Sequence, residues 1–267
     1  MEKIVAKNLV KKFGDKVAVN DVSLTVHSGE IFGFLGPNGA GKTTTIRLLA
    51  GALDTDEGEI YICKNPAPES EDYSQNTPIM MNYENDYIEI KSLIGVVPEE
   101  PPMFKSIRGN EFIRFIASVY NCDEDIFQRL NELCELLHID FLDEFIDNYS
   151  HGMKQKLMLV SVLMRRPEIM FLDEPTTGLD PYSARGLKLL LRRMADNGSA
   201  IFLTTHILEI AEKMCDRLTV ISDGSVVASG NIEQLRAKAG TEGDLEQIFL
   251  QLTGADENEI QRLVDEL

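Results

Sequence analysis

The chain has 267 residues, 43% of them hydrophobic, which is enough for one large domain with its own core. Its net charge of −18 opposes non-specific binding to the phosphates of nucleic acids and favours solubility, so no nucleic-acid partner is expected. No apolar stretch of 18 residues and no apolar leader is found, and the four cysteines lack C-x-x-C spacing, so we expect a cytoplasmic chain with reduced thiols.

The first strong signal is a glycine-rich loop between an apolar run at 30–35 and a helix-forming run at 44–50. The loop fits G-x-x-x-x-G-K-[ST], in which small residues let backbone N–H groups converge on phosphates at a helix N-terminus. It consists of Gly36, Pro37, Asn38, Gly39, Ala40, Gly41, Lys42 and Thr43, and Thr44 follows. We expect this loop to bind ATP, with Lys42 on the β- and γ-phosphates and the Thr43 hydroxyl on Mg²⁺.

The next segments are predicted to be a turn, a short strand and an irregular acidic stretch. A polar turn at 54–59 precedes a predicted strand at 60–62, and residues 65–90 then contain three prolines and several acids but no Lys or Arg. This acidic segment is predicted to be a mobile surface loop, with a contact to a partner as the alternative.

Apolar residues at helical spacing predict helical structure within 110–138. They are Phe112, Phe115, Ile116, Val119, Ile126, Leu130, Leu133 and Leu137. Two more short helices are predicted at 231–235 and 244–252, followed by an amphipathic tail formed by Ile260, Leu263, Val264 and Leu267. Whether the tail packs on the domain or on a partner stays open.

Two later apolar runs end in side chains that can do chemistry. Residues 169–172 fit a strand buried on both faces and lead into Asp173 and Glu174, and residues 200–203 lead through two threonines into His206. Ligands of parallel sheets bind at the carboxyl ends of the strands, so these side chains should meet at the phosphate site. Asp173 is predicted to hold Mg²⁺, Glu174 to polarise the attacking water, and His206 to bond the γ-phosphate or Glu174.

A loop of Tyr149, Ser150, His151, Gly152 and Met153 lies between the phosphate loop and Asp173. With it, the chain resembles the ATP-binding subunit of ABC transporters from about residue 4 to residue 254, and in particular a bacterial exporter branch with a similar loop. The resemblance implies an α/β fold: a P-loop NTPase (RecA-like) core with a parallel sheet, an antiparallel β subdomain and an inserted α-helical subdomain. It also implies an ATPase domain over 1–230, with its core at 1–98 and 165–230, the helical subdomain at 99–164, the acidic insertion at 65–90, and a helical tail at 231–267.

Further roles follow from the same resemblance. Phe13 stands where the family stacks a ring on adenine, although a core Phe in an edge strand is an equal alternative. Ser150 and Gly152 should close on the ATP of a second subunit, and residues 178–180 resemble the D-loop. Glu99 stands where the family often has a glutamine; it can still face Mg²⁺ or water, but it adds charge. His151 replaces the first of two adjacent glycines.

The partners implied are a transmembrane permease, of exporter type, and a second ABC ATPase subunit, identical or different. The chain would then lie on the inner face of the cell membrane, held there by the permease. Residues 101–104 would help to form a groove for a helix of the membrane subunit; a Pro-rich connector with a buried Phe is the alternative. A soluble ABC ATPase acting on nucleic acid or ribosomes is the competing function, which a single phosphate loop and the lack of sustained heptads disfavour.

Overall fold

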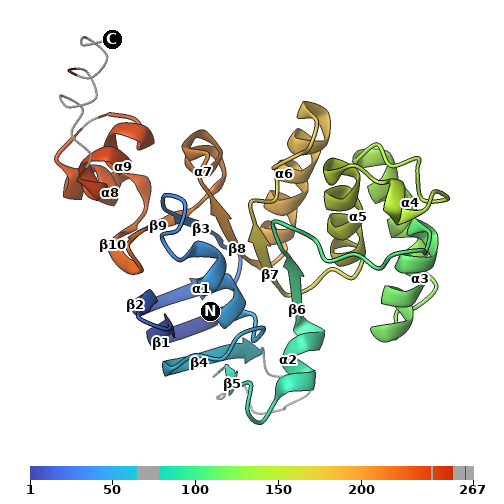
Figure 1. The fold of residues 1–267 in the computed structure, drawn as a ribbon, viewed down its shortest axis with the longest axis horizontal. Coiled ribbons are helices and arrows are strands. Elements are labelled where there is room, and N and C mark those ends of the chain that lie inside the picture. The colour runs from blue at the N-terminus through green and yellow to red at the C-terminus, as the bar shows by residue number, and fades with distance from the viewer. Residues whose placement is uncertain (65–77, 242, 255–261, 263–267) are drawn as a thin grey trace.

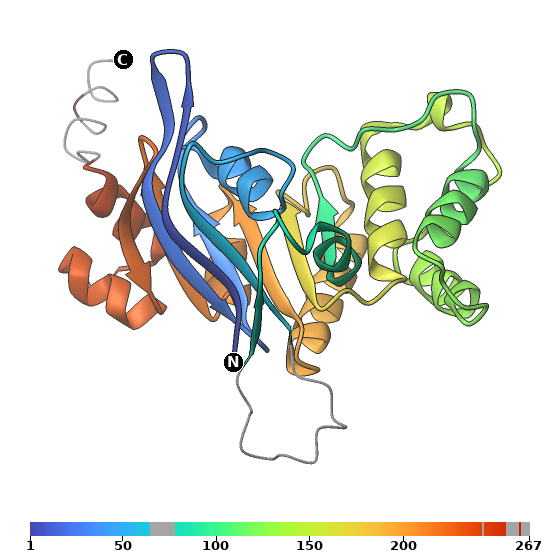
Figure 2. The same ribbon diagram turned by 90° about the horizontal axis from the view of Figure 1, so that it is seen from below.

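The computed structural model describes residues 1–64, 78–241, 243–254 and 262. Two sheets form the centre of the molecule, with helices α3 to α5 at one end and α8 and α9 at the other (Figure 1). The antiparallel sheet has the strand order β2-β1-β4-β5, and the larger sheet has the order β10-β9-β3-β8-β7-β6. In the larger sheet β10 runs antiparallel to β9, and the pairs β9-β3, β3-β8, β8-β7 and β7-β6 are parallel. Figure 2 shows the two sheets facing each other with α1 near them.

The strands of the antiparallel sheet are β1 (Glu2–Phe13), β2 (Lys16–His27), β4 (Glu57–Lys64) and β5 (Ile79–Met81). Those of the larger sheet are β3 (Ile31–Leu35), β6 (Ile94–Val97), β7 (Ile169–Asp173), β8 (Ala200–Thr205), β9 (Arg217–Ser222) and β10 (Ser225–Gly230). The helices are α1 (Lys42–Leu49), α2 (Tyr87–Leu93), α3 (Gly109–Val119), α4 (Ile126–Leu136), α5 (His151–Leu163), α6 (Pro181–Asp196), α7 (Leu208–Met214), α8 (Ile232–Ala239) and α9 (Leu245–Thr253).

The parallel strands lie between two hydrophobic cores, which explains their continuous apolar sequences. Every residue of β3, β7 and β8 is buried. Phe32, Phe171 and Phe202 face the core shared with α1 and the antiparallel sheet, whereas Ile31 and Met170 face the core shared with the helices of the other side. The sheet therefore holds its carboxyl ends rigidly, which is where the polar residues emerge.

The predicted fold class is confirmed, and one local prediction is wrong. Residues 65–77 of the acidic segment lie outside the described residues, but β5 and α2 lie within 79–93, where we predicted a loop up to residue 90. Met81 pairs with Ile62 of β4, and Ile90 is buried in the core. Pairing with a neighbouring strand and burial of an apolar side chain stabilise these short elements, and neither contact is visible in local sequence.

The two short helices predicted near the C-terminus are present as α8 and α9. Their N-caps are Asn231 and Asp244, whose side chains accept bonds from backbone N–H groups of the first turn. The predicted amphipathic tail beyond residue 254 lies outside the described residues, apart from position 262. Within the part of the chain that the structure describes, no helix is both long and apolar enough to span a bilayer.

Candidate functional site

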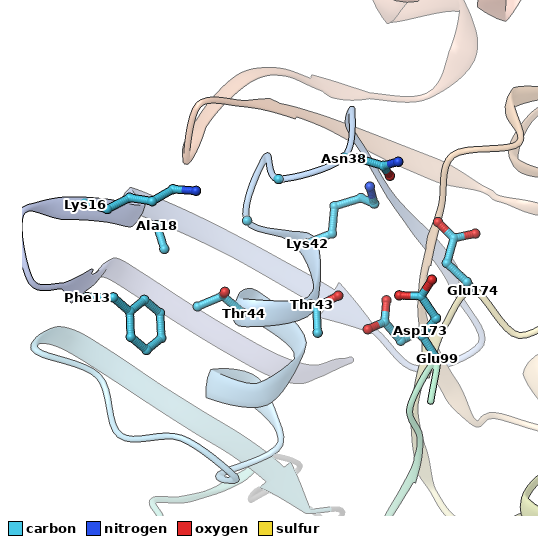
Figure 3. Close-up of a pocket in the computed structure, with 12 residues that line it drawn as sticks. Phe13, Lys16, Ala18, Asn38, Lys42, Thr43, Thr44, Glu99, Asp173 and Glu174 are labelled. Atoms are coloured by element: carbon cyan, nitrogen blue, oxygen red, sulfur yellow. The ribbon is translucent and has the colours of Figure 1, made fainter. Parts of the chain in front are cut away.

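A cavity of about 290 Å³ opens where β3, β6 and β7 end (Figure 3). Most of the predicted site residues line it: Phe13, Asn38, Gly39, Gly41, Lys42, Thr43, Thr44, Glu99, Asp173 and Glu174. Gly36, Pro37 and Ala40 belong to the same loop without lining the cavity. The three parallel strands thus bring together residues from positions 38 to 174.

The loop after β3 leads directly into α1, and its backbone requires glycine at position 41. Gly41 has φ +106°, and a Cβ there would collide with the carbonyl oxygen of Ala18. The next residue, Lys42, is almost fully buried, and its Nζ donates to the carbonyl oxygens of Gly36 (2.8 Å) and Pro37 (3.1 Å). The loop therefore surrounds one cationic group at the N-terminus of a helix, an arrangement suited to an anion.

The acidic part of the site comes from the end of β7. Asp173 is buried and accepts a hydrogen bond from the Thr204 hydroxyl of β8. Glu174 is also buried, and its Oε1 lies 2.8 Å from Nδ1 of His206, which follows β8. Oε2 of Glu174 is buried with no hydrogen-bond partner among the described residues. The parallel pairing of Asp173 with Thr204 places the two strand ends together and so joins these side chains.

The backbone at Glu174 is unusual as well. Its φ of +48° is in the left-handed region, which costs a non-glycine residue about 1 kcal/mol or more. The backbone N–H of Glu174 donates to the carbonyl oxygen of Thr204 at 3.2 Å, which helps to hold this conformation. A strained, buried carboxylate beside a cavity is characteristic of a site of chemistry rather than of a simple strand end.

The opposite end of the cavity is aromatic. Phe13 is 52% exposed at the end of β1, an inner strand of its sheet, so the alternative of a core Phe in an edge strand is wrong. Lys16 and Ala18 of β2 line the cavity beside it, and neither was predicted from the sequence. The signal was present: a two-residue turn of Gly14 and Asp15 joins β1 to β2 and pairs Phe13 with Lys16.

The loop that resembles the ABC signature does not line this cavity. Ser150 is the exposed N-cap of α5, and its hydroxyl accepts a bond from Met153 N at 3.2 Å. A Cβ on Gly152 would collide with the carbonyl oxygen of Gly178, so the loop packs closely against the residues that resemble the D-loop. His151 is exposed and its ring carbon is also near Gly178.

Those residues are held by an ion pair. Asp180 is the N-cap of α6, and its carboxylate accepts bonds from Lys156 Nζ of α5 (2.7 Å) and from Ser183 N (2.9 Å). The hydrogen bond from Lys156, followed by those from Ser183, holds the pKa of Asp180 well below its usual range. Helix α5 and the start of α6 are therefore joined next to the signature loop.

A second, larger cavity of about 490 Å³ lies away from this site. We call it the α3–α5 groove, and it is lined among others by Met103, Phe104, Phe112, Phe115, Met158 and Val162. Phe104 is 53% exposed, and its ring contacts those of Phe112 and Phe115 at 6.1 Å and 5.4 Å. The alternative of a connector with a buried Phe is therefore wrong.

Comparisons with known proteins point to one family. Residues 19–177 match the family model described as ABC transporter. The Nod factor export ATP-binding protein I of Burkholderia lata is 36% identical over 229 residues, covering 84% of this chain and 69% of that protein. The uncharacterized ABC transporter ATP-binding protein YhcH of Bacillus subtilis is 31% identical over 233 residues, covering 85% and 69%.

A solved structure described as the ATP-binding subunit of an ABC transporter superposes with a TM-score of 0.83 at 28% identity, covering 94% of this chain and 99% of that one. An ATP-binding cassette bound to ADP and Pi has the same fold, with a TM-score of 0.71 at 22% identity, covering 86% of this chain and 98% of that one. The phosphate loop, the acids at the end of β7 and these likenesses lead to one conclusion: the chain belongs to the ABC transporter family of ATP-binding proteins and is an ATPase.

Proposed function

We propose that this ATPase is the motor subunit of an exporter: it dimerises around two Mg-ATP molecules and drives a separate transmembrane permease. The observation that carries the proposal is the contact of 2.8 Å between buried Glu174 and His206 beside the phosphate loop. The name of the Nod factor export relative supports the direction of transport. The permease, the dimer and the individual site roles given below are parts of the proposal.

In this proposal the two ends of the cavity bind the two ends of ATP. The exposed ring of Phe13 offers a face for the adenine, and base–aromatic stacking of this kind contributes about 1–3 kcal/mol. Loop N–H groups and Lys42 bind the phosphates, for which Lys42 must exchange its bonds to Gly36 and Pro37 for phosphate oxygens. Lys16 lies between these ends, where its ammonium can reach the ribose or the α-phosphate.

The donor set fits Mg²⁺. Figure 3 shows the side chains of Thr43, Asp173 and Glu99 directed toward the same part of the cavity, and all three offer oxygen atoms, the ligands that Mg²⁺ prefers. These residues would hold the ion, directly or through water. When bound, it would neutralise phosphate charge and orient the terminal phosphoryl group. Glu99 in place of a glutamine makes this donor set more acidic.

Hydrolysis then depends on Glu174. Its unpartnered Oε2 is the acceptor available to a water molecule, and a water held there is polarised for attack on the γ-phosphorus. The contact of Oε1 with His206 fixes the carboxylate in one orientation. The side chain of His206 is itself 54% exposed, so its other ring nitrogen is available for a hydrogen bond to the terminal phosphate.

The proposed dimer accounts for the residues that stay outside the cavity. Ser150 and His151 are exposed and Gly152 is half-buried, all at the N-terminus of α5, where backbone N–H groups suit an anion. We infer that they bind the ATP of a second subunit, identical or different. The α3–α5 groove, with its exposed aromatic rings, is the proposed docking site for a segment of the permease, which would place this chain peripherally on the cytoplasmic face of the membrane.

The test uses Glu174→Gln, which retains size and hydrogen bonding but cannot act as a base. With Mg-ATP this variant should become a stable dimer by light scattering, and affinity capture from solubilised native membranes should recover a polytopic membrane protein without a phosphate loop. Glu209→Gln, an exposed acid on α7, is the matched control and should behave like the parent chain. Recovery of ribosomal or DNA-associated proteins alone would refute the transport role and favour the soluble alternative.

A further inference from the structure

Two basic side chains border the α3–α5 groove, whose lining is otherwise mostly apolar. They are Lys91 on α2 and Arg165, which follows α5. No ion pair joins either one to an Asp or Glu among the described residues. Both side chains are partly buried, so a missing carboxylate partner costs more here than it does for a cation in open solvent.

Arg165 is incompletely satisfied. Its guanidinium lies 3.6 Å from the centre of the Tyr120 ring, and Nη2 donates to the carbonyl oxygen of Ile94 at 3.4 Å, close to the limit for a hydrogen bond. Nε is buried with no partner in the described part of the chain. Burial lowers the pKa of Arg165, the direction expected for a cation that lacks a compensating negative charge.

Lys91 is held in place at the other side of the α3–α5 groove. Its Nζ donates to the carbonyl oxygens of Ala50 (2.6 Å) and Gly51 (3.3 Å), just beyond the end of α1, and lies 5.6 Å and 5.0 Å from the ring centres of Tyr83 and Tyr87. These partners hold the ammonium in place without neutralising it, and one of its three N–H groups remains for another acceptor. Burial lowers its pKa too.

We propose that the occupant of the α3–α5 groove is a segment of the membrane partner that combines apolar side chains with at least one carboxylate, which pairs with Arg165 and Lys91. This inference rests on the proposed function, because that is the source of the membrane partner. Apolar side chains would cover Phe104 and Phe115, and the carboxylate would supply the charge that both cations lack. A planar guanidinium already held against Tyr120 loses little freedom when it binds a carboxylate.

The pairing also gives the site specificity. A neutral segment would cover the same apolar surface but would bury two uncompensated cations, which is costly. Because Lys91 donates to carbonyl groups just after α1, and α1 begins at the phosphate loop, a carboxylate paired with Lys91 would be linked through that ammonium to the far end of the helix that carries Lys42. The groove and the nucleotide site are thus joined by one helix.

The test measures binding of defined peptides to the parent chain by fluorescence anisotropy. One labelled amphipathic peptide carries a leucine face with a central Glu, and the matched peptide carries Gln at that position. The parent chain should bind the Glu peptide about tenfold more tightly, and Arg165→Gln should remove the preference while leaving the Gln peptide unaffected. Arg114→Gln, an exposed cation of α3 outside the groove, should keep the preference.

Equal affinity for the two peptides, no binding of either, or a preference that survives in both Arg165→Gln and Lys91→Gln would overturn the inference. If Arg165→Gln does not unfold cooperatively on heating, Lys91→Gln replaces it as the test variant. Vesicles of phosphatidylglycerol test for an anionic lipid: cosedimentation that depends on Arg165, without a peptide preference, would overturn the assignment of a protein segment as the occupant.

Failure of the capture experiment with Glu174→Gln would refute the proposed function itself, whereas capture of the membrane protein with equal peptide affinities would refute only the proposed pairing with a carboxylate.

Discussion

The contact between His206 and Glu174 makes the proposed mechanism testable by removing one imidazole. In His206→Ala the Oε1 atom of Glu174 loses its side-chain partner at 2.8 Å, and Oε2 has none among the described residues. The carboxylate, only 5% exposed, would then have to find water or rotate away from the position that holds the attacking water. We therefore expect a loss of turnover without a loss of ATP binding.

The size of the effect follows from the strength of that contact. A hydrogen bond to a charged group contributes about 1.5–3 kcal/mol. If all of it orients Glu174 in the transition state, kcat should fall by about ten- to a hundredfold. The affinity for Mg-ATP should stay within about twofold, because the phosphate loop and Phe13 are unchanged.

The assay is phosphate release at saturating Mg-ATP, together with equilibrium titration of a fluorescent ATP analogue. The matched control is His27→Ala, because His27 makes a similar contact of 3.1 Å with Glu30 but lies away from the cavity. Its kcat should equal that of the parent chain. If His206→Ala hydrolyses ATP at the parent rate, His206 does not orient Glu174, and this role of His206 has to be abandoned.

Three further predictions concern other parts of the molecule. Lys42→Ala should weaken ATP binding by about a hundredfold or more in the same titration, and unchanged affinity would contradict the role of the phosphate loop. Phe13→Ala should weaken it by about fivefold to a hundredfold, whereas Phe13→Tyr should retain it, as stacking requires. The lowered pKa of Asp180 means that its pairing with Lys156 stabilises the fold above about pH 4 and loses this effect as the pH falls further. Thermal melts from about pH 6 to about pH 3 should accordingly show Asp180→Asn less stable than the parent chain at the upper end, with the difference shrinking toward the lower end; a constant difference would contradict the pairing.

Much of the larger sheet could be predicted because it is buried on both faces. Residues 169–172 and 200–203 are continuous apolar runs for this reason, and the residues that follow each run had to emerge at one edge of the sheet. The glycines of the phosphate loop are similarly readable, since Gly41 occupies a backbone conformation that other residues rarely adopt. In these places one local requirement determines the residue type.

Contacts between segments that are distant in sequence could not be predicted from local sequence. The strand β5 exists because β4 offers it hydrogen bonds, and its own three residues carry no decisive pattern. Whether the ring of Phe13 is available to stack on adenine or is packed in the core depended on which face of the antiparallel sheet stays uncovered. Lys16 becomes notable only after the hairpin pairs it with Phe13.

The acids at the end of β7 show why motif and structure together say more than either alone. An Asp-Glu pair after an apolar run is compatible with a strand that simply enters water, where both side chains would be exposed. Here both are buried, Glu174 has a left-handed backbone, and one of its oxygens has no partner in the described chain. Such an arrangement is unfavourable for the isolated fold, since desolvating a carboxylate without compensation costs free energy. It is retained at the one edge of the sheet where Lys42 also lies, so we attribute that cost to the need for a carboxylate with a free oxygen beside the phosphates.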